Sequence, residues 1–176
     1  KISGIETVLW NDQFENILTL ILAQTKNIYL EKNEHIRSKT KVETAQDRFI
    51  KKIKSEFSSY NIKRSYPIIS ELRMVKNDIE ITQIKKACDI TEMGFRRVLD
   101  FIKPGVWEYE IEAEYSHEFL NNRSKGFAYQ PIIASGINSC CLHYNTNNMQ
   151  CKDGEMVLMD VGSEYANYRS DMTRTV

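Results

Sequence analysis

The strongest structural signal in the chain is a capped amphipathic pattern that starts at Asn77 and stops at Pro104–Gly105. An asparagine followed three residues later by a glutamate, here Glu80, can satisfy the first free amides of a helix. Apolar side chains then recur at helical spacing and form one stripe, made of Ile84, Cys88, Thr91, Phe95, Val98, Leu99 and Ile102. The pattern predicts a long helix with one buried face, ended by the proline and the glycine.

The second half of the chain continues with one more helix and then changes character. A helix is predicted from about Glu108 to Asn121, because Ile111, Tyr115 and Phe119 share one face. After Gly126 short apolar, aromatic and β-branched segments predict strands over residues 129–134, 141–144, 156–160 and 168–175. Two helices followed by antiparallel strands indicate an α+β fold.

Residues 1–64 alternate between short strand-like and helix-like segments. The predicted elements are strands at Thr7–Trp10 and Asn27–Leu30, a helix containing Phe14 to Leu22, a polar connection from Glu31 to Lys41, and a helix from Glu43 to Ser58. This piece is predicted to be α/β. The basic segment that runs into Pro67 predicts a domain join, so we divide the chain into residues 1–64 and 65–176.

The composition of the chain limits the classes of binding partner and indicates the cellular compartment. The 24 basic and 24 acidic residues give no net charge, which does not favour nucleic acid or an anionic membrane surface as a partner. The longest apolar run, Ile17–Ala23, is too short to span a bilayer. Four cysteines lack the spacing of a disulfide framework, which favours a reduced, cytoplasmic setting. The chain begins without methionine and ends inside a predicted strand, so we expect a piece of a longer protein.

Two aspartates in the last strands are the candidate chemical centre. Asp160 closes an apolar run, and Asp171 lies on the expected return strand of a hairpin. If the two side chains face each other, their Cβ atoms stand about 5 Å apart. Carboxylates that close repel each other unless one is protonated or a metal lies between them. Hard oxygen ligands suit Mn²⁺, Mg²⁺, Zn²⁺ or Co²⁺, and a metal pair can activate water for hydrolysis. On spacing alone, turn or surface aspartates would be the commoner explanation.

A series of motifs resembles the pita-bread metallopeptidases, the family that includes aminopeptidase P, prolidase and methionine aminopeptidase. Asp160-Val-Gly followed by Asp171-x-Thr-Arg-Thr is similar to the metal-binding hairpin of that family. The upstream segments that match in order are Leu72-Arg73-x-x-Lys76, Pro104-Gly105, Glu108-Tyr109-Glu110, Ser135-Gly136 and Leu142-His143-Tyr144. The resemblance covers about residues 67–176 and is nearest to aminopeptidase P, with prolidase as the close alternative. It implies the first half of a pita-bread catalytic domain, preceded by the end of a smaller α/β domain.

The resemblance also implies roles for individual residues. Asp160 would bind one metal ion in bidentate fashion and Asp171 would bridge two. The cofactor would be two divalent ions, with manganese favoured and zinc or cobalt as alternatives; one histidine and two glutamates beyond residue 176 would complete the set. His143 would face the substrate, and Tyr129 would hydrogen-bond a ligand or intermediate, although plain sheet packing explains a tyrosine there nearly as well. Thr173 would orient Asp171.

The activity implied is hydrolysis by a metal-bridged hydroxide, which releases the first residue of a peptide whose second residue is proline. The full-length protein is expected to form homo-oligomers, and this chain by itself is expected to be inactive and poorly stable. Prolidase activity and a non-catalytic peptide-binding role are the alternatives. A zinc site made of Cys140, Cys141, His143 and Cys151 is disfavoured, because neighbours on a strand point to opposite faces.

Overall fold

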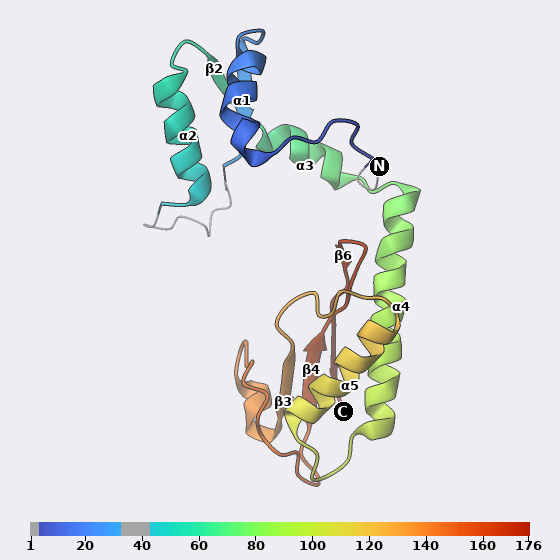
Figure 1. Cartoon of the computed structure of the whole chain (residues 1–176). Coiled ribbons are helices and arrows are strands. Elements are labelled where there is room, and N and C mark those ends of the chain that lie inside the picture. Colours follow the sequence, from blue (N-terminus) through green and yellow to red (C-terminus); the bar gives the residue numbers. More distant parts are fainter. Residues whose placement is uncertain (1–3, 33–42) are drawn as a thin grey trace. The chain divides into compact units, whose positions relative to one another are not determined.

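The structure, a computed structural model, describes residues 4–32 and 43–176. It divides into two compact units, Lys1–Val75 and Lys76–Val176, which are considered separately below (Figure 1). The division falls after helix α3 (Tyr66–Met74), whereas the sequence placed the join before residue 65. Pro67 lies in the first turn of α3, where a missing backbone N–H costs no helical hydrogen bond. The proline is therefore compatible with the start of a helix.

The first unit is a small α/β piece. Its elements are η1 (Asn11–Gln13), α1 (Phe14–Leu22), β1 (Asn27–Leu30), α2 (Ala45–Glu56), β2 (Asn61–Arg64) and α3. β1 and β2 pair in parallel, with Asn27 opposite Asn61. The predicted helices and the strand at 27–30 are confirmed, but β2 was missed. The prediction of a strand at Thr7–Trp10 is wrong, because that segment pairs with no strand among residues 4–32 and 43–176. Most of the predicted polar connection lies outside the described residues.

The second unit contains two helices and an antiparallel sheet, which confirms the α+β prediction. Its elements are α4 (Asp78–Phe101), α5 (Glu108–Asn121), β3 (Ile132–Ser135), η3 (Gly136–Cys140), β4 (Val157–Val161), β5 (Glu164–Tyr165), β6 (Tyr168–Arg169) and β7 (Met172–Thr175). The main sheet has the order β3-β4-β7, and β5 and β6 form a separate hairpin. The predicted strand at 141–144 is wrong: that segment forms a turn.

Helix α4 begins as its sequence predicts. The Asn77 side chain accepts a hydrogen bond from the Glu80 amide at 3.0 Å, and the Glu80 carboxylate accepts one from the Asn77 amide at 2.9 Å. The buried face differs from the predicted stripe, because Cys88 and Leu99 are exposed. The residues that are buried instead are Ala87, Ile90, Thr91, Gly94 and Val98.

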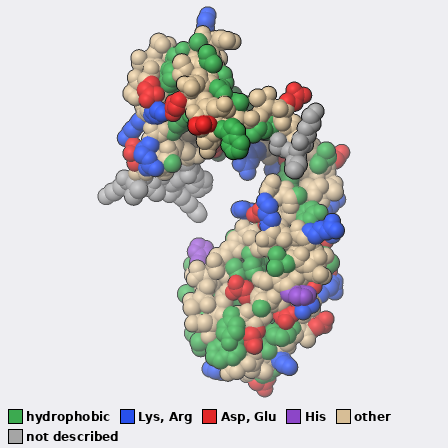
Figure 2. Space-filling view, viewed as in Figure 1, with side chains coloured by type: hydrophobic (Ala, Val, Ile, Leu, Met, Phe, Trp, Pro, Cys, Tyr) green, Lys and Arg blue, Asp and Glu red, His purple; other side chains and the backbone are tan. Residues whose placement is uncertain are grey.

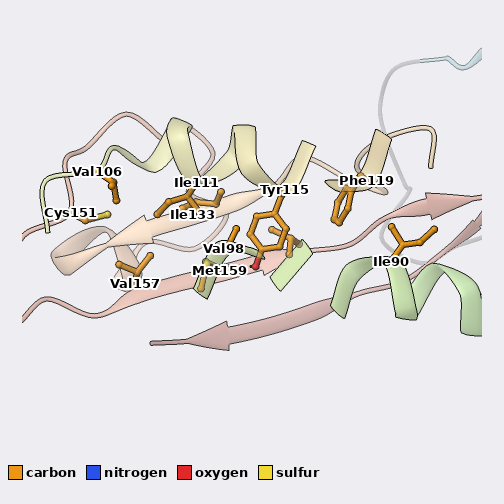
Figure 3. Packing of buried hydrophobic residues seen from close by; sticks show 11 residues of the cluster. Ile90, Val98, Val106, Ile111, Tyr115, Phe119, Ile133, Cys151, Val157 and Met159 are labelled. Atoms are coloured by element: carbon orange, nitrogen blue, oxygen red, sulfur yellow. Dashed lines mark hydrogen bonds between the residues drawn. The ribbon is translucent and has the colours of Figure 1, made fainter. Parts of the chain in front are cut away.

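The small residues on the buried face of α4 are explained by the close packing of α5 against that face. A Cβ atom at Gly94 would lie 2.8 Å from the ring of Phe119 and 2.9 Å from the ring of Tyr115, both on α5. Ile111, Tyr115 and Phe119 are fully buried, as predicted, and reach the strands on their other side. Figure 3 shows these side chains with Met159 and Val157 of β4 in one apolar layer between helix and sheet. The sheet that carries the aspartates is thus backed by a rigid core.

The surface carries mixed charge. Acidic and basic side chains are interspersed on the visible face (Figure 2), and their totals in the sequence are equal. Within the part of the chain that the structure describes, no helix combines the length and the apolar character needed to cross a bilayer.

Candidate metal and substrate site

The two aspartates lie on the same face of the sheet, two residues out of direct opposition. Asp160 on β4 is paired with Thr173 on β7, and Asp171 lies two positions before Thr173. Since side chains alternate along a strand, Asp171 points to the same side as Thr173 and Asp160. The expectation of directly opposed side chains is therefore replaced by a diagonal pair. Asp160 is half-buried and Asp171 is exposed.

Gly162 allows the chain to bring Asp171 near Asp160. A Cβ atom at this position would lie 1.9 Å from the carbonyl oxygen of Ser170 and 2.7 Å from its carbonyl carbon. Only a glycine leaves room for that backbone, which immediately precedes Asp171. The Ala128 amide also donates a hydrogen bond to the Gly162 carbonyl at 2.8 Å, which ties the segment before Tyr129 to the same point.

The residues between the aspartates form the β5–β6 hairpin. Ala166 and Asn167, at its tip, have φ values of 50° and 67°. Positive φ at both central residues is the geometry of a two-residue turn whose twist matches that of the strands. The predicted arrangement of two strand arms and a short turn is confirmed.

Tyr129 joins the two carboxylates. Its hydroxyl lies 2.6 Å from Asp160 Oδ1 and 3.1 Å from Asp171 Oδ1, so it can donate to either. The two oxygens are thus no farther apart than the sum of these distances. Burial, together with the neighbouring Asp160, raises the pKa of Tyr129 well above its usual value. The hydroxyl therefore keeps its proton and acts as a donor.

His143 lines a pocket together with Tyr129 and the two aspartates. The pocket has a volume of about 350 Å³, and its lining residues are Tyr129, Gln130, Ile132, His143, Asn145, Asp160 and Asp171. His143 is exposed and lies in a turn with a φ of 54°, in the left-handed region. The structure therefore brings together all four of the site residues selected from the sequence, although His143 reaches the pocket from a loop.

Thr173, the fifth residue singled out, has a different neighbour from the one expected. It lies opposite Asp160 in the β4–β7 ladder. The Asp171 carboxylate instead accepts from Tyr129. In the described part of the chain no hydrogen bond joins Thr173 to Asp171.

A buried cluster of hydroxyl groups behind the aspartates was missed by the sequence analysis. Thr91 Oγ1 on α4 lies 2.6 Å from Ser170 Oγ, and the Ser163 amide donates to both, at 2.9 and 3.0 Å. Ser163 Oγ donates to the Ala87 carbonyl at 2.8 Å. The cluster fastens both ends of the β5–β6 hairpin to α4. Its residues are ordinary polar residues in the sequence, so the only available signal was their position beside the Asp160 and Asp171 motifs.

The donor set fits a divalent cation in part. Asp160 and Asp171 offer hard carboxylate oxygens at one edge of the pocket, which is the chemistry that Mn²⁺ and similar ions favour. Among the described residues, no group of three or more His, Cys, Asp or Glu side chains could hold a metal ion. Metal affinity depends on the complete set of ligands. The two carboxylates alone are thus fewer ligands than a tightly bound divalent ion requires.

Comparison with known proteins assigns the chain to a protein family. The sequence profile of metallopeptidase family M24 matches residues 82–176, more than half of the chain. The Xaa-Pro aminopeptidase of Escherichia coli is 39% identical over 109 residues, which are 62% of this chain and 25% of that protein. The chain therefore spans about a quarter of the length of this curated relative.

Solved structures agree with the sequence comparisons. A Bacillus anthracis protein assigned as an aminopeptidase P has a TM-score of 0.85 and 34% identity, and the match covers 98% of this chain and 41% of that one. Zinc-substituted Escherichia coli aminopeptidase P in complex with product has a TM-score of 0.80 and 28% identity, with coverage of 98% and 39%. The fold is thus that of a part of these structures.

Proposed function

Because the chain belongs to metallopeptidase family M24, we propose that the full-length protein is a metal-dependent aminopeptidase that releases the first residue of peptides with proline in second position. The observation that carries the proposal is the convergence of Asp160 and Asp171 on the Tyr129 hydroxyl in the pocket that His143 lines. The relative named Xaa-Pro aminopeptidase supports the choice of substrate.

In this proposal the chain's own residues bind the cofactor and the peptide. Asp160 and Asp171 would hold two divalent ions, manganese in preference to zinc or cobalt, with further ligands from beyond residue 176. When bound, such a pair supplies Lewis acidity and an activated water. Tyr129 donates to the carboxylates and fixes their orientation. His143 faces the peptide and can donate a proton or hydrogen bond toward the oxygen on which charge develops.

The remaining parts of the proposal concern the state of the protein. The chain of residues 1–176 alone is inactive and poorly stable, because two carboxylates are too few ligands for tight metal binding. The full-length protein is a homo-oligomer in a reduced, cytoplasmic setting, which suits the four unpaired cysteines. The division into an α/β domain before residue 65 and a catalytic domain after it belongs to the same proposal.

The test uses the full-length gene product loaded with Mn²⁺. Release of the first amino acid is measured from an Xaa-Pro-Xaa tripeptide and from an Xaa-Pro dipeptide, with and without chelator. Metal-dependent release from the tripeptide is expected, and Asp171→Asn should abolish it. Asp153→Asn, an exposed aspartate in the turn before β4, is the matched control and should leave activity unchanged. Release from the dipeptide alone would indicate prolidase activity, and binding without hydrolysis would indicate a peptide-binding module.

A further inference from the structure

Glu108, the first residue of α5, is a carboxylate with no exposed surface. Its Oε1 accepts hydrogen bonds from the Ser135 amide at 2.7 Å, the Ser135 hydroxyl at 2.8 Å and Asn138 Nδ2 at 3.4 Å. Its Oε2 accepts from the Tyr144 hydroxyl at 2.7 Å and the Met149 amide at 2.9 Å. None of these donors is a cation. A buried carboxylate is stable only with such a set of donors.

The carboxylate is ionised in the folded protein. Burial alone would raise the pKa of Glu108, but the hydrogen bonds from Tyr144, Met149 and Ser135 outweigh burial and hold the pKa below its ordinary value. The position of Glu108 in the first turn of α5 also favours a negative charge.

The five donors belong to the segment that carries His143. Ser135 and Asn138 lie before His143, Tyr144 follows it directly, and Met149 ends the segment. The Tyr144 hydroxyl also accepts from Asn138 Nδ2 at 3.1 Å. One carboxylate thus fastens the start, the middle and the end of an irregular segment of the chain.

A second glutamate of α5 holds the same segment one helical turn later. Asn147 Nδ2 donates to Glu112 Oε2 at 2.9 Å, and Asn147 Oδ1 accepts from the Ile133 amide on β3 at 3.0 Å. Residues four apart lie on the same side of a helix. The segment is therefore attached to one side of α5 and to β3.

His143 depends on these attachments for its position. Within the part of the chain that the structure describes, no hydrogen bond or ion pair restrains its imidazole. Its φ of 54° is sparsely populated for a residue other than glycine, and such a conformation persists only where the surroundings impose it. The next residue, Tyr144, is held in place by its hydrogen bond to Glu108.

We propose that Glu108 is a positioning residue for the reaction: it fixes residues 136–149 so that His143 faces the pocket lined by Asp160 and Asp171. The inference rests on the proposed function, in which His143 contacts the peptide. Glu108 does not touch the carboxylates of Asp160 or Asp171, so it acts on the reaction through the loop and not through the metal ligands.

The test uses the full-length protein and a matched pair of variants. Glu108→Gln removes the buried charge. It also replaces one accepting oxygen by an NH₂ group, which cannot accept the hydrogen bonds that the loop donates to Glu108. Glu110→Gln removes a charge from the same helical turn, where Glu110 accepts from the Trp107 amide at 2.8 Å and does not contact the loop. Glu108→Gln should lower kcat on the order of 100-fold, the effect of displacing a catalytic group by about 1 Å. Bound metal and the kcat of Glu110→Gln should stay at the parent values.

A double-variant cycle separates positioning from general destabilisation. If Glu108 acts through His143, Glu108→Gln should have no further effect on kcat in a His143→Ala background. Losses that multiply would overturn the inference. If His143→Ala alone keeps the parent kcat, the role proposed for His143 fails, which is a different result from failure of the positioning role.

Hydrogen–deuterium exchange tests the loop independently of activity. Amides of residues 141–149 should exchange faster in Glu108→Gln than in Glu110→Gln, and equal protection would overturn the inference. Should Glu108→Gln fail to fold, Tyr144→Phe removes one of the five hydrogen bonds and keeps the charge. It should lower kcat about tenfold, as expected for one hydrogen bond to a charged group. Parent-like kcat and exchange in Tyr144→Phe would also overturn it.

Discussion

Replacing Gly162 by alanine should disrupt the proposed metal site more than it disrupts the core. The added methyl would lie 1.9 Å from the Ser170 carbonyl oxygen. Since non-bonded heavy atoms prefer separations of about 3.5–4.0 Å, the backbone before Asp171 must move by on the order of 1.5 Å. Such overpacking against backbone should cost about 3 kcal/mol of stability. The displaced Asp171 should weaken apparent Mn²⁺ affinity by about 10–100-fold, as loss of ligand orientation does.

Gly94→Ala is the control for this prediction. Its methyl would also be too close to its neighbours, at 2.8 and 2.9 Å from the rings of Phe119 and Tyr115, but these neighbours belong to α5 and not to the segment that carries Asp171. The gain in helix propensity, about 1 kcal/mol, offsets part of the overpacking. Melting temperature and Mn²⁺ titration of activity in the full-length protein measure the two effects. Parent-like metal affinity in Gly162→Ala would refute the claim that the close approach of Gly162 and Ser170 places Asp171.

Three further predictions concern hydrogen bonds of the site. Tyr129→Phe should destabilise the metal-free protein by about 1.5–3 kcal/mol, because two carboxylates lose their shared donor. Saturating Mn²⁺ should reduce the difference in melting temperature between the variant and the parent. An equal difference with and without the metal would contradict this prediction. Thr91→Val should cost about 1–2 kcal/mol in urea unfolding, since its hydroxyl lies between Ser163 and Ser170; an unchanged midpoint would show that the cluster does not stabilise the hairpin. Because the pKa of Glu108 is lowered on folding, its contribution to stability is present above the unfolded-state pKa and is lost as pH falls through the folded value. The melting temperature of Glu108→Gln should therefore fall less steeply than that of the parent between about pH 5 and 3, and parallel curves would contradict the assignment.

The helices of the second unit could be predicted because their signals are local. The hydrogen bonds between Asn77 and Glu80 join residues three apart, and the face of Ile111, Tyr115 and Phe119 follows from helical periodicity. The face of α4 was only partly predicted. Its burial depends on the aromatic rings of α5, which select Gly94 and leave Cys88 exposed.

The loop that carries His143 could not be predicted as irregular. Its apolar and aromatic residues are typical of a strand. Its hydrogen bonds, however, join Glu108 and Glu112 of α5 and, through the Asn147 side chain, the Ile133 amide, and they do not form the backbone ladder of a strand pair. The Tyr144–Glu108 bond spans 36 residues of sequence. A buried glutamate at a helix start resembles any exposed acidic residue of a first turn until the segment that covers it is known.

By itself the sequence determined the starts of α4 and α5, the strands that carry the β4–β7 ladder and the motif residues Tyr129, His143, Asp160 and Asp171, because local capping, side-chain alternation and motif order are properties of neighbouring residues. Only the tertiary structure decided which carboxylate oxygens meet the Tyr129 hydroxyl, which hydroxyl groups fasten the hairpin to α4, and how Glu108 holds the loop of His143. These contacts join segments between 27 and 79 residues apart. Their geometry is set by the packing of α4 and α5 against the sheet, which no local pattern encodes.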